Sequence, residues 1–212
     1  DQGTWIDPDI GIAMSFRRLA IIDLSSAGHQ PMHSSSGRYI LCFNGEIYNH
    51  LELRKNICSS NHWKGHSDSE TLLAVIEKIG IEAALKKCVG MFAIAIWDRA
   101  KRKLTLARDR LGEKPLYYGW TNNNFVWGSE LKAIKKFPKF DNKISKEALE
   151  NFLQFSYVPA PKSIYEDIFK LEPASYVEFD CKNILSRKFT IKKYWDLNKI
   201  ASGYSSTVTN DD

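Results

Sequence analysis

The sequence predicts an α+β fold in which two stacked, mostly antiparallel sheets are covered by layers of helices. Residues 39–42 and 91–97 are apolar throughout, and a strand of that kind is buried on both faces. Residues 70–79 place their apolar side chains at the spacing of an amphipathic helix. A strand that is buried on both faces needs a packed layer on each side, so the sheets must stack and helices must cover them.

The first half of the chain is expected to alternate between strands and helices. Residues 10–23 are β-prone, with a polar break at Arg17 and Arg18. Ser67 and Glu70 have the spacing of a capping box at the start of a helix. In order, we expect two strands within 10–23, a loop over 25–37, and helices at 51–57, 67–79 and 81–88.

The second half is expected to begin with two hairpins and to end in shorter elements. Residues 98–102 and 122–124 are polar turns between apolar runs. Ser145 is placed to cap a helix. The side chains expected to face inward from that helix are those of Leu149, Phe152 and Leu153. In order, we expect strands at 91–97, 103–107, 116–120 and 125–128, helices at 129–137 and 145–155, and strands near 176–179 and 189–194.

The segment Asn44-Gly45-Glu46 follows the apolar run of residues 39–42. Asn-Gly is a strong signal for a hairpin turn, and one interpretation is that it only reverses the chain. The other interpretation is a polar pocket at the end of a buried strand. The Asn44 amide and the Gly45 backbone N–H are the two kinds of donor that stabilise an oxyanion. Glu46 could hold a substrate cation beside them.

Composition and charge are ordinary for a globular protein. The net charge of +5 is modest. Lysines such as Lys132, Lys135 and Lys136 occur without a nucleic-acid motif, so solvated faces are expected and no nucleic-acid partner. No stretch is long and apolar enough to span a membrane, and no signal peptide is recognised, so no membrane partner is expected.

The chain has four cysteines, Cys42, Cys58, Cys88 and Cys181. No two of them form a Cys-x-x-Cys pair, so a zinc site is not expected. Cys42 and Cys88 lie in apolar patterns typical of buried thiols, which favours a cytoplasmic location. His29 and His33 lie in a loop without a third ligand at a suitable spacing, so no metal is predicted.

Six groups of residues occur in an order known from one protein family and cover most of residues 11–179. They are Arg17–Leu24, Gly28–Met32, Asn44–Asn49, Gly65–Glu70, Gly90–Ala93 and Arg108–Tyr118. Together they resemble the class II glutamine amidotransferase domain, as it occurs in the glutamine-hydrolysing asparagine synthetases. One such motif is a weak signal, whereas six in register are a strong one. The resemblance implies the four-layer αββα sandwich of N-terminal-nucleophile hydrolases.

The resemblance also implies a role for each candidate residue. Arg18 matches the ligand of the glutamine α-carboxylate. Asn44 and Gly45 match the oxyanion hole, and they are the catalytic residues that the resemblance assigns within this chain. Glu46 and Asp68 match the pair that binds the glutamine α-amino group. The segment of residues 108–112 matches structural support near the active site.

Two of these residues also have a simpler interpretation. Arg18 and Arg17 could be surface arginines at a bend, although a guanidinium also binds a carboxylate in its planar fork. Asp68 lies in the first turn of a predicted helix, where a carboxylate is favourable without any ligand. Both roles can hold at once for Asp68. The family usually has His where this chain has Phe16, which leaves the contacts around Arg18 undefined.

In the resembled mechanism an N-terminal cysteine attacks the glutamine amide, a thioester forms, ammonia leaves, and water releases glutamate. This chain opens at Asp1, so the nucleophilic cysteine is expected to be absent from it and the fragment to be inactive alone. Cys42 is not expected to substitute, because it lies in an apolar run without a base beside it.

The expected organisation is that of a fragment. Residues 1–140 are expected to be the amidotransferase domain without its N-terminus, and residues 141–200 the end of that domain and the start of a synthetase domain. Residues 201–212 are predicted to be a disordered tail. No cofactor is expected in the fragment, whereas ATP and Mg²⁺ are expected for the synthetase domain.

The function implied by the resemblance is supply of ammonia for ATP-dependent amidation of aspartate. The expected partners are L-glutamine and a covalently linked synthetase domain. The true amide acceptor and a homodimer remain open. The alternative is a non-catalytic regulatory or interaction module that keeps the fold, although such a module has no use for an oxyanion hole.

Overall fold

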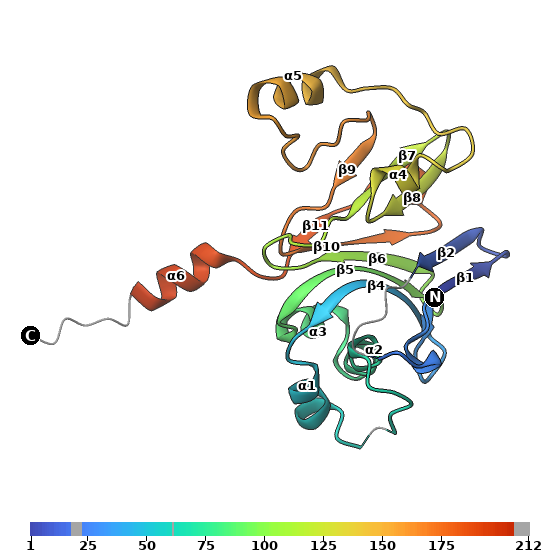
Figure 1. The fold of residues 1–212 in the computed structure, drawn as a ribbon, viewed down its shortest axis with the longest axis vertical. Helices are drawn as coiled ribbons and strands as arrows, with labels where there is room; N and C mark the ends of the chain where they lie inside the picture. The colour runs from blue at the N-terminus through green and yellow to red at the C-terminus, as the bar shows by residue number, and fades with distance from the viewer. Residues whose placement is uncertain (18–22, 61, 206–212) are drawn as a thin grey trace, which may run out of the picture.

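The structure is a computed structural model that describes residues 1–17, 23–60 and 62–205. Figure 1 shows helices α1–α3 on one side of a large sheet and a smaller sheet, with α4 and α5 beyond it, on the other. All strand pairings are antiparallel within the described ranges. The predicted α+β sandwich of two stacked sheets between helices is therefore confirmed.

The large sheet has six strands in the order β11-β10-β6-β5-β4-β3. They are β3 (Met32–His33), β4 (Tyr39–Ile47), β5 (Gly90–Asp98), β6 (Lys103–Arg108), β10 (Ser175–Asp180) and β11 (Ile191–Lys193). Strand β10 pairs with β6 from Tyr176↔Ala107 to Asp180↔Lys103. The division near residue 140 stays a prediction, but the chain beyond it adds strands to this sheet.

The second sheet layer is made of two pieces. A three-stranded sheet has the order β8-β7-β9, with β7 (Tyr117–Thr121), β8 (Asn124–Gly128) and β9 (Ile168–Lys170). A separate two-stranded ribbon is formed by β1 (Gln2–Asp7) and β2 (Ile12–Arg17). One apolar core contains Met14 of β2, Tyr118 of β7 and Val177 of β10. Both pieces therefore pack on the same face of the large sheet.

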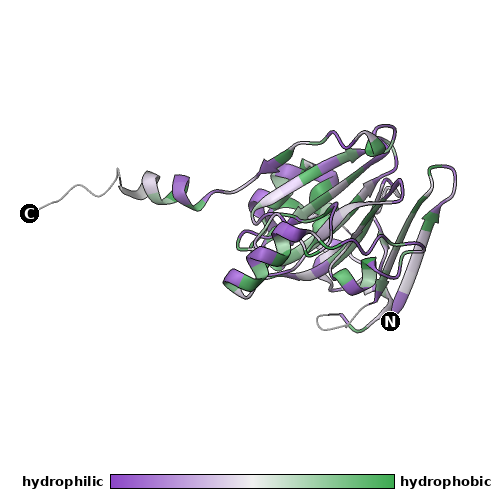
Figure 2. Ribbon diagram, turned by 90° about the horizontal axis from the view of Figure 1, so that it is seen from above, coloured by the Kyte–Doolittle hydropathy of each residue, from purple (hydrophilic) through white to green (hydrophobic). Residues whose placement is uncertain are grey.

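Six α-helices are described: α1 (His50–Ile57), α2 (Asp68–Ile79), α3 (Ile81–Lys87), α4 (Leu131–Ile134), α5 (Lys146–Phe155) and α6 (Leu197–Ser205). Short 3₁₀ turns are η1 (Ser26–Gly28) and η2 (Ile184–Ser186). Helix α6 extends away from the body (Figure 1 and Figure 2), and it covers the first part of the predicted tail, residues 201–205. Residues 206–212 lie outside the described ranges.

Alternate residues of β4 face two different cores. Leu41 and Phe43 pack in the core beneath helices α2 and α3. Ile40 and the partly buried Cys42 pack in the core between the sheets, together with Trp97 of β5. Because side chains alternate along a strand, the even-numbered residues that follow Cys42 also face the second sheet. The predicted burial of this strand on both faces is confirmed.

The interpretation of Asn44-Gly45 as a chain reversal is wrong, because β4 continues through both residues to Ile47. With the backbone as it lies here, a β-carbon at Gly45 would be 2.6 Å from the α-carbon of Phe92 on β5. Glycine is needed here for the close approach of two paired backbones and not for chain reversal. The turn signal and a glycine within a strand look the same in a sequence.

The predicted helices are confirmed in the first half and only partly in the second. Helix α4 is much shorter than 129–137, because the N–H groups of Lys136 and Phe137 bond three residues back and tighten the chain before Pro138. Ser145 caps α5 as predicted. The prediction that three side chains of α5 face inward is wrong, because Leu149, Phe152 and Leu153 are 43%, 48% and 75% exposed.

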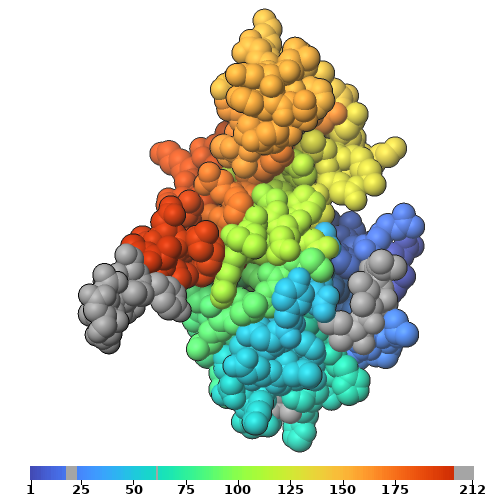
Figure 3. Space-filling view, turned by 60° about the vertical axis from the view of Figure 1, so that its left-hand side comes forward, coloured from blue at the N-terminus to red at the C-terminus, as the bar shows by residue number. Residues whose placement is uncertain are grey.

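Helix α5 is exposed because no other element within the described ranges covers its apolar face. Its buried residue is Ala148. Figure 3 shows the orange α5 region as a lobe that stands out from the rest of this face. Strands β3 and β9 were not predicted, since each has only two or three residues in the structure.

The loop after β6 is organised around the fully buried Asp109. Its carboxylate accepts hydrogen bonds from the backbone N–H groups of Phe92, Leu111, Glu113 and Lys114, at 2.9–3.1 Å. The neighbouring Arg108 donates to three backbone carbonyls, those of Gly112, Lys114 and Leu171. These adjacent charged residues therefore satisfy the backbone of a loop that has no ladder partner.

We expect Asp109→Ala to lower the free energy of unfolding by more than about 3 kcal/mol, because four N–H groups lose a charged acceptor at once. Asp180→Ala is the matched control. The Asp180 carboxylate accepts from Lys182 N–H in an exposed turn, and its loss is expected to be below about 1 kcal/mol. Urea unfolding of both variants checks this, and equal losses would contradict the organising role of Asp109.

Candidate functional site

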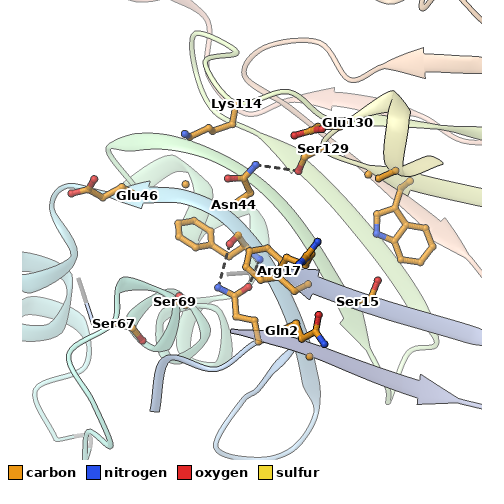
Figure 4. Close-up of a pocket in the computed structure, with 18 of the residues that line it drawn as sticks. Gln2, Ser15, Arg17, Asn44, Glu46, Ser67, Ser69, Lys114, Ser129 and Glu130 are labelled. Carbon is orange, nitrogen blue, oxygen red and sulfur yellow. Dashed lines mark hydrogen bonds between the residues drawn. The ribbon is translucent and has the colours of Figure 1, made fainter. Parts of the chain in front are cut away.

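A polar cleft with a volume of about 1120 Å³ lies where β2, β4, the start of α2 and the β8–α4 junction meet. Figure 4 shows the side chains that converge on it. Its lining includes Gln2, Ser15, Arg17, Asp23, Gln30, Asn44, Gly45, Glu46, Ser67, Asp68, Ser69, Lys114, Ser129 and Glu130. The cleft thus brings together segments that lie as far apart in the sequence as Gln2 and Ala133.

Four of the five predicted site residues line this one cleft: Asn44, Gly45, Glu46 and Asp68. The fifth, Arg18, lies outside the described residues. Its neighbour Arg17 ends β2 and lines the cleft. The structure therefore brings the predicted residues together, while the role of each one stays a prediction.

The backbone of β4 presents a row of N–H groups at one edge. Beyond Leu41, β3 no longer pairs with this edge. The Phe43 N–H donates to the side chain of Gln30 at 2.7 Å, and the Ile47 N–H donates to Asp68 at 2.9 Å. Since N–H groups two residues apart point the same way, the Gly45 N–H between them points to the same edge. That edge borders the cleft, as the second of the predicted oxyanion donors requires.

Gln30 fixes β4 just before the candidate donors. Its amide oxygen accepts from the Phe43 N–H, and its amide nitrogen donates to the Phe43 carbonyl at 3.2 Å. The side chain is buried and replaces a ladder partner that β3 is too short to supply. The Gly28–Met32 motif contains Gln30, but nothing in the sequence indicates that its side chain would pair with a strand.

Asp68 is buried at the first position of α2, directly after the cap residue Ser67. One carboxylate oxygen accepts from the Ile47 N–H, and the other accepts from the Ser69 N–H at 2.9 Å. Burial raises the pKa of Asp68, and these backbone hydrogen bonds offset that only in part. The predicted place of Asp68 in the first helical turn is confirmed.

The segment before α2 is held by Arg54 of α1. Its guanidinium donates to the carbonyls of Gly65 and Ser67 at 3.0 and 2.9 Å, and it lies 3.9 Å from the centre of the Trp63 ring. Ser67 accepts from the Glu70 N–H as a capping box requires. The Glu70 carboxylate, however, accepts from the N–H groups of residues 64 and 65 instead of reaching back to Ser67. The capping box is therefore half formed, and its other half anchors the preceding loop.

Asn44 is oriented by a contact from the other sheet. Its side-chain amide donates to the hydroxyl of Ser129 at 3.1 Å, as Figure 4 shows. Ser129 lies between the end of β8 and the start of α4. No local pattern in the sequence points to this residue, because the contact joins positions 85 residues apart in two different layers.

The cleft carries charges of both signs. Glu46 and Asp68 contribute carboxylates, while Arg17 and Lys114 contribute cations. Lys114 closes the loop that Asp109 organises, and it lines the same cleft as Asn44. Mixed charges around a polar cleft suit a small zwitterion better than a purely apolar ligand.

Each of the four cysteines holds its thiol proton more tightly than usual. Burial raises the pKa of Cys42 and that of Cys88 to about 12, and that of Cys181 to about 11. Burial also raises the pKa of Cys58. A thiol with a pKa of about 11 or 12 is almost wholly protonated near neutral pH, so Cys42, Cys88 and Cys181 lack the thiolate that a nucleophile needs.

The described ranges contain no group of three His, Cys, Asp or Glu side chains placed to hold a metal ion. Among the helices described, none has the length and apolar character needed to cross a membrane.

The fold is shared with solved structures. One is the glutamine phosphoribosylpyrophosphate amidotransferase of B. subtilis complexed with ADP and GMP, with a TM-score of 0.60 at 17% identity over 86% of this chain and 35% of that one. Another is described as the allosteric regulatory enzyme of purine biosynthesis, with a TM-score of 0.59 and 18% identity over the same shares. At such identities the likeness concerns the fold alone.

Sequence comparison identifies the family. Residues 1–195 match the family described as the glutamine amidotransferase domain. The chain is 39% identical over 168 residues to asparagine synthetase (glutamine-hydrolyzing) 1 of Bacillus subtilis, covering 79% of this chain and 26% of that protein. It is 34% identical over 220 residues to the second such synthetase of the same organism, covering 100% and 28%. The chain belongs to the glutamine amidotransferase domain family, and it spans less than a third of these two relatives.

The ionisation of Asp68 should be visible in the pH dependence of stability. Because its pKa is raised on folding, the folded chain keeps the proton to a higher pH than the unfolded chain. The stability that this proton contributes is full below the ordinary pKa and is lost as pH rises through the folded pKa. We therefore expect wild type to lose stability relative to Asp68→Asn over that window, as measured by urea unfolding at several pH values.

Asp98→Asn is the control of opposite sign. Burial is the largest single influence on Asp98 and opposes its ionisation. The hydrogen bonds from Arg38 at 3.1 and 2.7 Å, the charge of Arg38 and the N–H groups of Ala100 and Lys101 together outweigh burial and lower the pKa. Wild type should thus gain stability relative to Asp98→Asn as pH rises toward the ordinary pKa of aspartate. Profiles with the same slope for both variants would contradict the assignment at Asp68.

Proposed function

We propose that the cleft binds L-glutamine and that the domain hydrolyses its side-chain amide to glutamate and ammonia. The observation that carries this is that Asn44 and Gly45, on the open edge of β4, line one cleft together with carboxylates and cations. An amide carbonyl that is attacked by a nucleophile becomes an oxyanion. Two converging N–H donors stabilise that charge as it forms.

The charges of the cleft fit the other end of the same substrate. Glu46 and Asp68 are proposed to bind the α-ammonium group, and Asp68 must be ionised to do so. Arg18, as the resemblance assigns it, is proposed to bind the α-carboxylate in its planar fork. One glutamine molecule would then bind these residues with its α-ammonium and α-carboxylate groups and present its side-chain amide to Asn44 and Gly45.

The nucleophile is proposed to come from a cysteine that heads a segment outside this sequence, as in the resembled mechanism. A second cavity of about 880 Å³ lies between β2 and β8, with Ala93 and Ala95 of β5 among its lining. In the described ranges β2 pairs with β1 alone, and β8 pairs with β7 alone. An apolar extended segment could pair with both facing edges. Asn44 lines both cavities, so the end of such a segment would reach the oxyanion donors.

The whole protein is proposed to be a glutamine-dependent asparagine synthetase that uses this ammonia to amidate aspartate. Support comes from the names of the relatives and from the share of their length that this chain spans. ATP and Mg²⁺ would serve the synthetase domain, and a cytoplasmic location would follow. A homodimer and another acceptor carboxylate are compatible with the same amidotransferase domain.

We expect Asn44→Ala in the full-length protein to lower glutaminase kcat by about a hundred- to a thousandfold and to change the KM for glutamine far less. The reason is that the amide grips the oxygen strongly only when it carries negative charge. Asn56→Ala, an exposed change on α1, is the matched control. Steady-state kinetics of glutamate release checks this, and an equal loss in glutamine affinity would make Asn44 a ground-state contact.

We also expect this chain alone to release no glutamate from glutamine, whether or not Cys42 is present. Burial keeps the Cys42 thiol protonated, and the free α-amino group that activates the family nucleophile belongs only to a first residue. The measurement compares this chain, its Cys42→Ala variant and a form extended to an N-terminal cysteine. Activity confined to the extended form supports the proposal. Activity that disappears with Cys42→Ala contradicts it and makes Cys42 the nucleophile. An inactive extended form also contradicts it and favours a non-catalytic module.

A further inference from the structure

The hydrogen bond between Asn44 and Ser129 joins the two sheet layers at the site. Asn44 lies on β4 of the large sheet, and Ser129 follows β8 of the second sheet. The amide nitrogen donates to the hydroxyl oxygen at 3.1 Å. A side-chain amide is planar, so fixing one of its two N–H bonds also fixes the direction of the other. The second N–H is then available to a ligand in the cleft.

Without such a contact the amide plane is poorly defined. The last torsion of an asparagine side chain is broad and nearly two-fold, so that rotation exchanges its oxygen and nitrogen. An exchanged amide would present an acceptor to the developing oxyanion and repel it. Stabilisation of a transition state depends on donors that are already oriented, which gives a neighbour that fixes the plane a direct effect on rate.

Ser129 is itself held from both sides. Gly128, the residue before it, ends β8 in register with Tyr117 of β7. The next residue, Glu130, accepts the first backbone hydrogen bonds of α4 from Ala133 and Ile134. Ile134 is buried in a small core with Val126 and Ile168. The serine hydroxyl is therefore placed by a paired strand and a packed helix, whereas Asn44 and Asp68 are placed by β4 and α2.

We propose that Ser129 is a positioning residue of the glutaminase reaction, which orients the Asn44 amide so that it donates to the oxyanion. This rests on the proposed function. It also means that the second sheet, which contributes neither of the two oxyanion donors, sets the geometry of one of them. A hydroxyl group is required at this position, and the size of the side chain matters less.

The kinetic test uses the full-length protein with Ser129→Ala, Ser129→Thr, Asn44→Ala and the double variant Asn44→Ala/Ser129→Ala. We expect Ser129→Ala to lower kcat by about tenfold, less than the loss of the donor itself, with the KM for glutamine nearly unchanged. Ser129→Thr should restore kcat to within about twofold of wild type. Because Ser129 acts through Asn44, Ser129→Ala should cause no further loss in the Asn44→Ala background.

Ser35→Ala is the control, since it also removes a hydroxyl that makes a hydrogen bond, here to Glu77 at 2.7 Å and away from the cleft. It should leave kcat unchanged. An additive loss in the double variant, a loss expressed in KM, or an unchanged kcat in Ser129→Ala would each overturn the proposal.

A second measurement separates this proposal from the proposed function. In protein labelled with ¹⁵N-asparagine, the side-chain NH₂ signals of Asn44 are identified by their loss in Asn44→Ala. They should shift or broaden in Ser129→Ala and stay in place in Ser129→Thr and Ser35→Ala. If the Asn44 signals are unchanged in Ser129→Ala, the proposal is overturned even if glutamine is hydrolysed. If wild type hydrolyses no glutamine, the proposed function fails, and with it the catalytic role of Ser129, while the spectra still decide whether Ser129 orients Asn44.

Discussion

The open edge of β4 beyond Leu41 is the constraint on which the site depends. A strand inside a sheet normally gives its N–H groups to a neighbour, and a buried N–H without a partner is costly. Here β3 ends early. The side chains of Gln30 and Asp68 accept hydrogen bonds from the N–H groups of this edge on either side of Gly45. The fold thereby keeps one backbone donor at the cleft without leaving the rest of the edge unsatisfied.

Strand β4 is packed against a different core on each of its two faces. The odd-numbered residues of the strand are anchored in the helix-covered core and the even-numbered ones face the second sheet. Asn44 therefore faces the second sheet, where it contacts Ser129, and the loop that Asp109 organises places Lys114 in the lining of the same cleft. The site lies between the two cores. A change in the packing of either sheet therefore alters the positions of the same few polar groups.

Much of this could be predicted from the sequence because it depends on local patterns. Apolar runs identified β4 and β5, helical spacing identified α2, and the motifs identified the residues that now line the cleft. The errors have a common physical origin. Asn44-Gly45 carries a turn signal, but the glycine serves the close approach of β5. Leu149 and Phe152 have the spacing of a buried face, yet burial also requires a partner layer. Gln30 and Ser129 act through distant contacts, and periodicity contains no information about those.

The protonated state of the chain's own thiols has a practical consequence for chemical labelling. Alkylating reagents react with the thiolate, so Cys42, Cys88 and Cys181 present a nearly silent background at neutral pH. A cysteine introduced beside Asn44 with an ordinary or lowered pKa would then be modified first. An electrophilic substrate analogue could in this way label the introduced cysteine alone, without substitution of the four native cysteines.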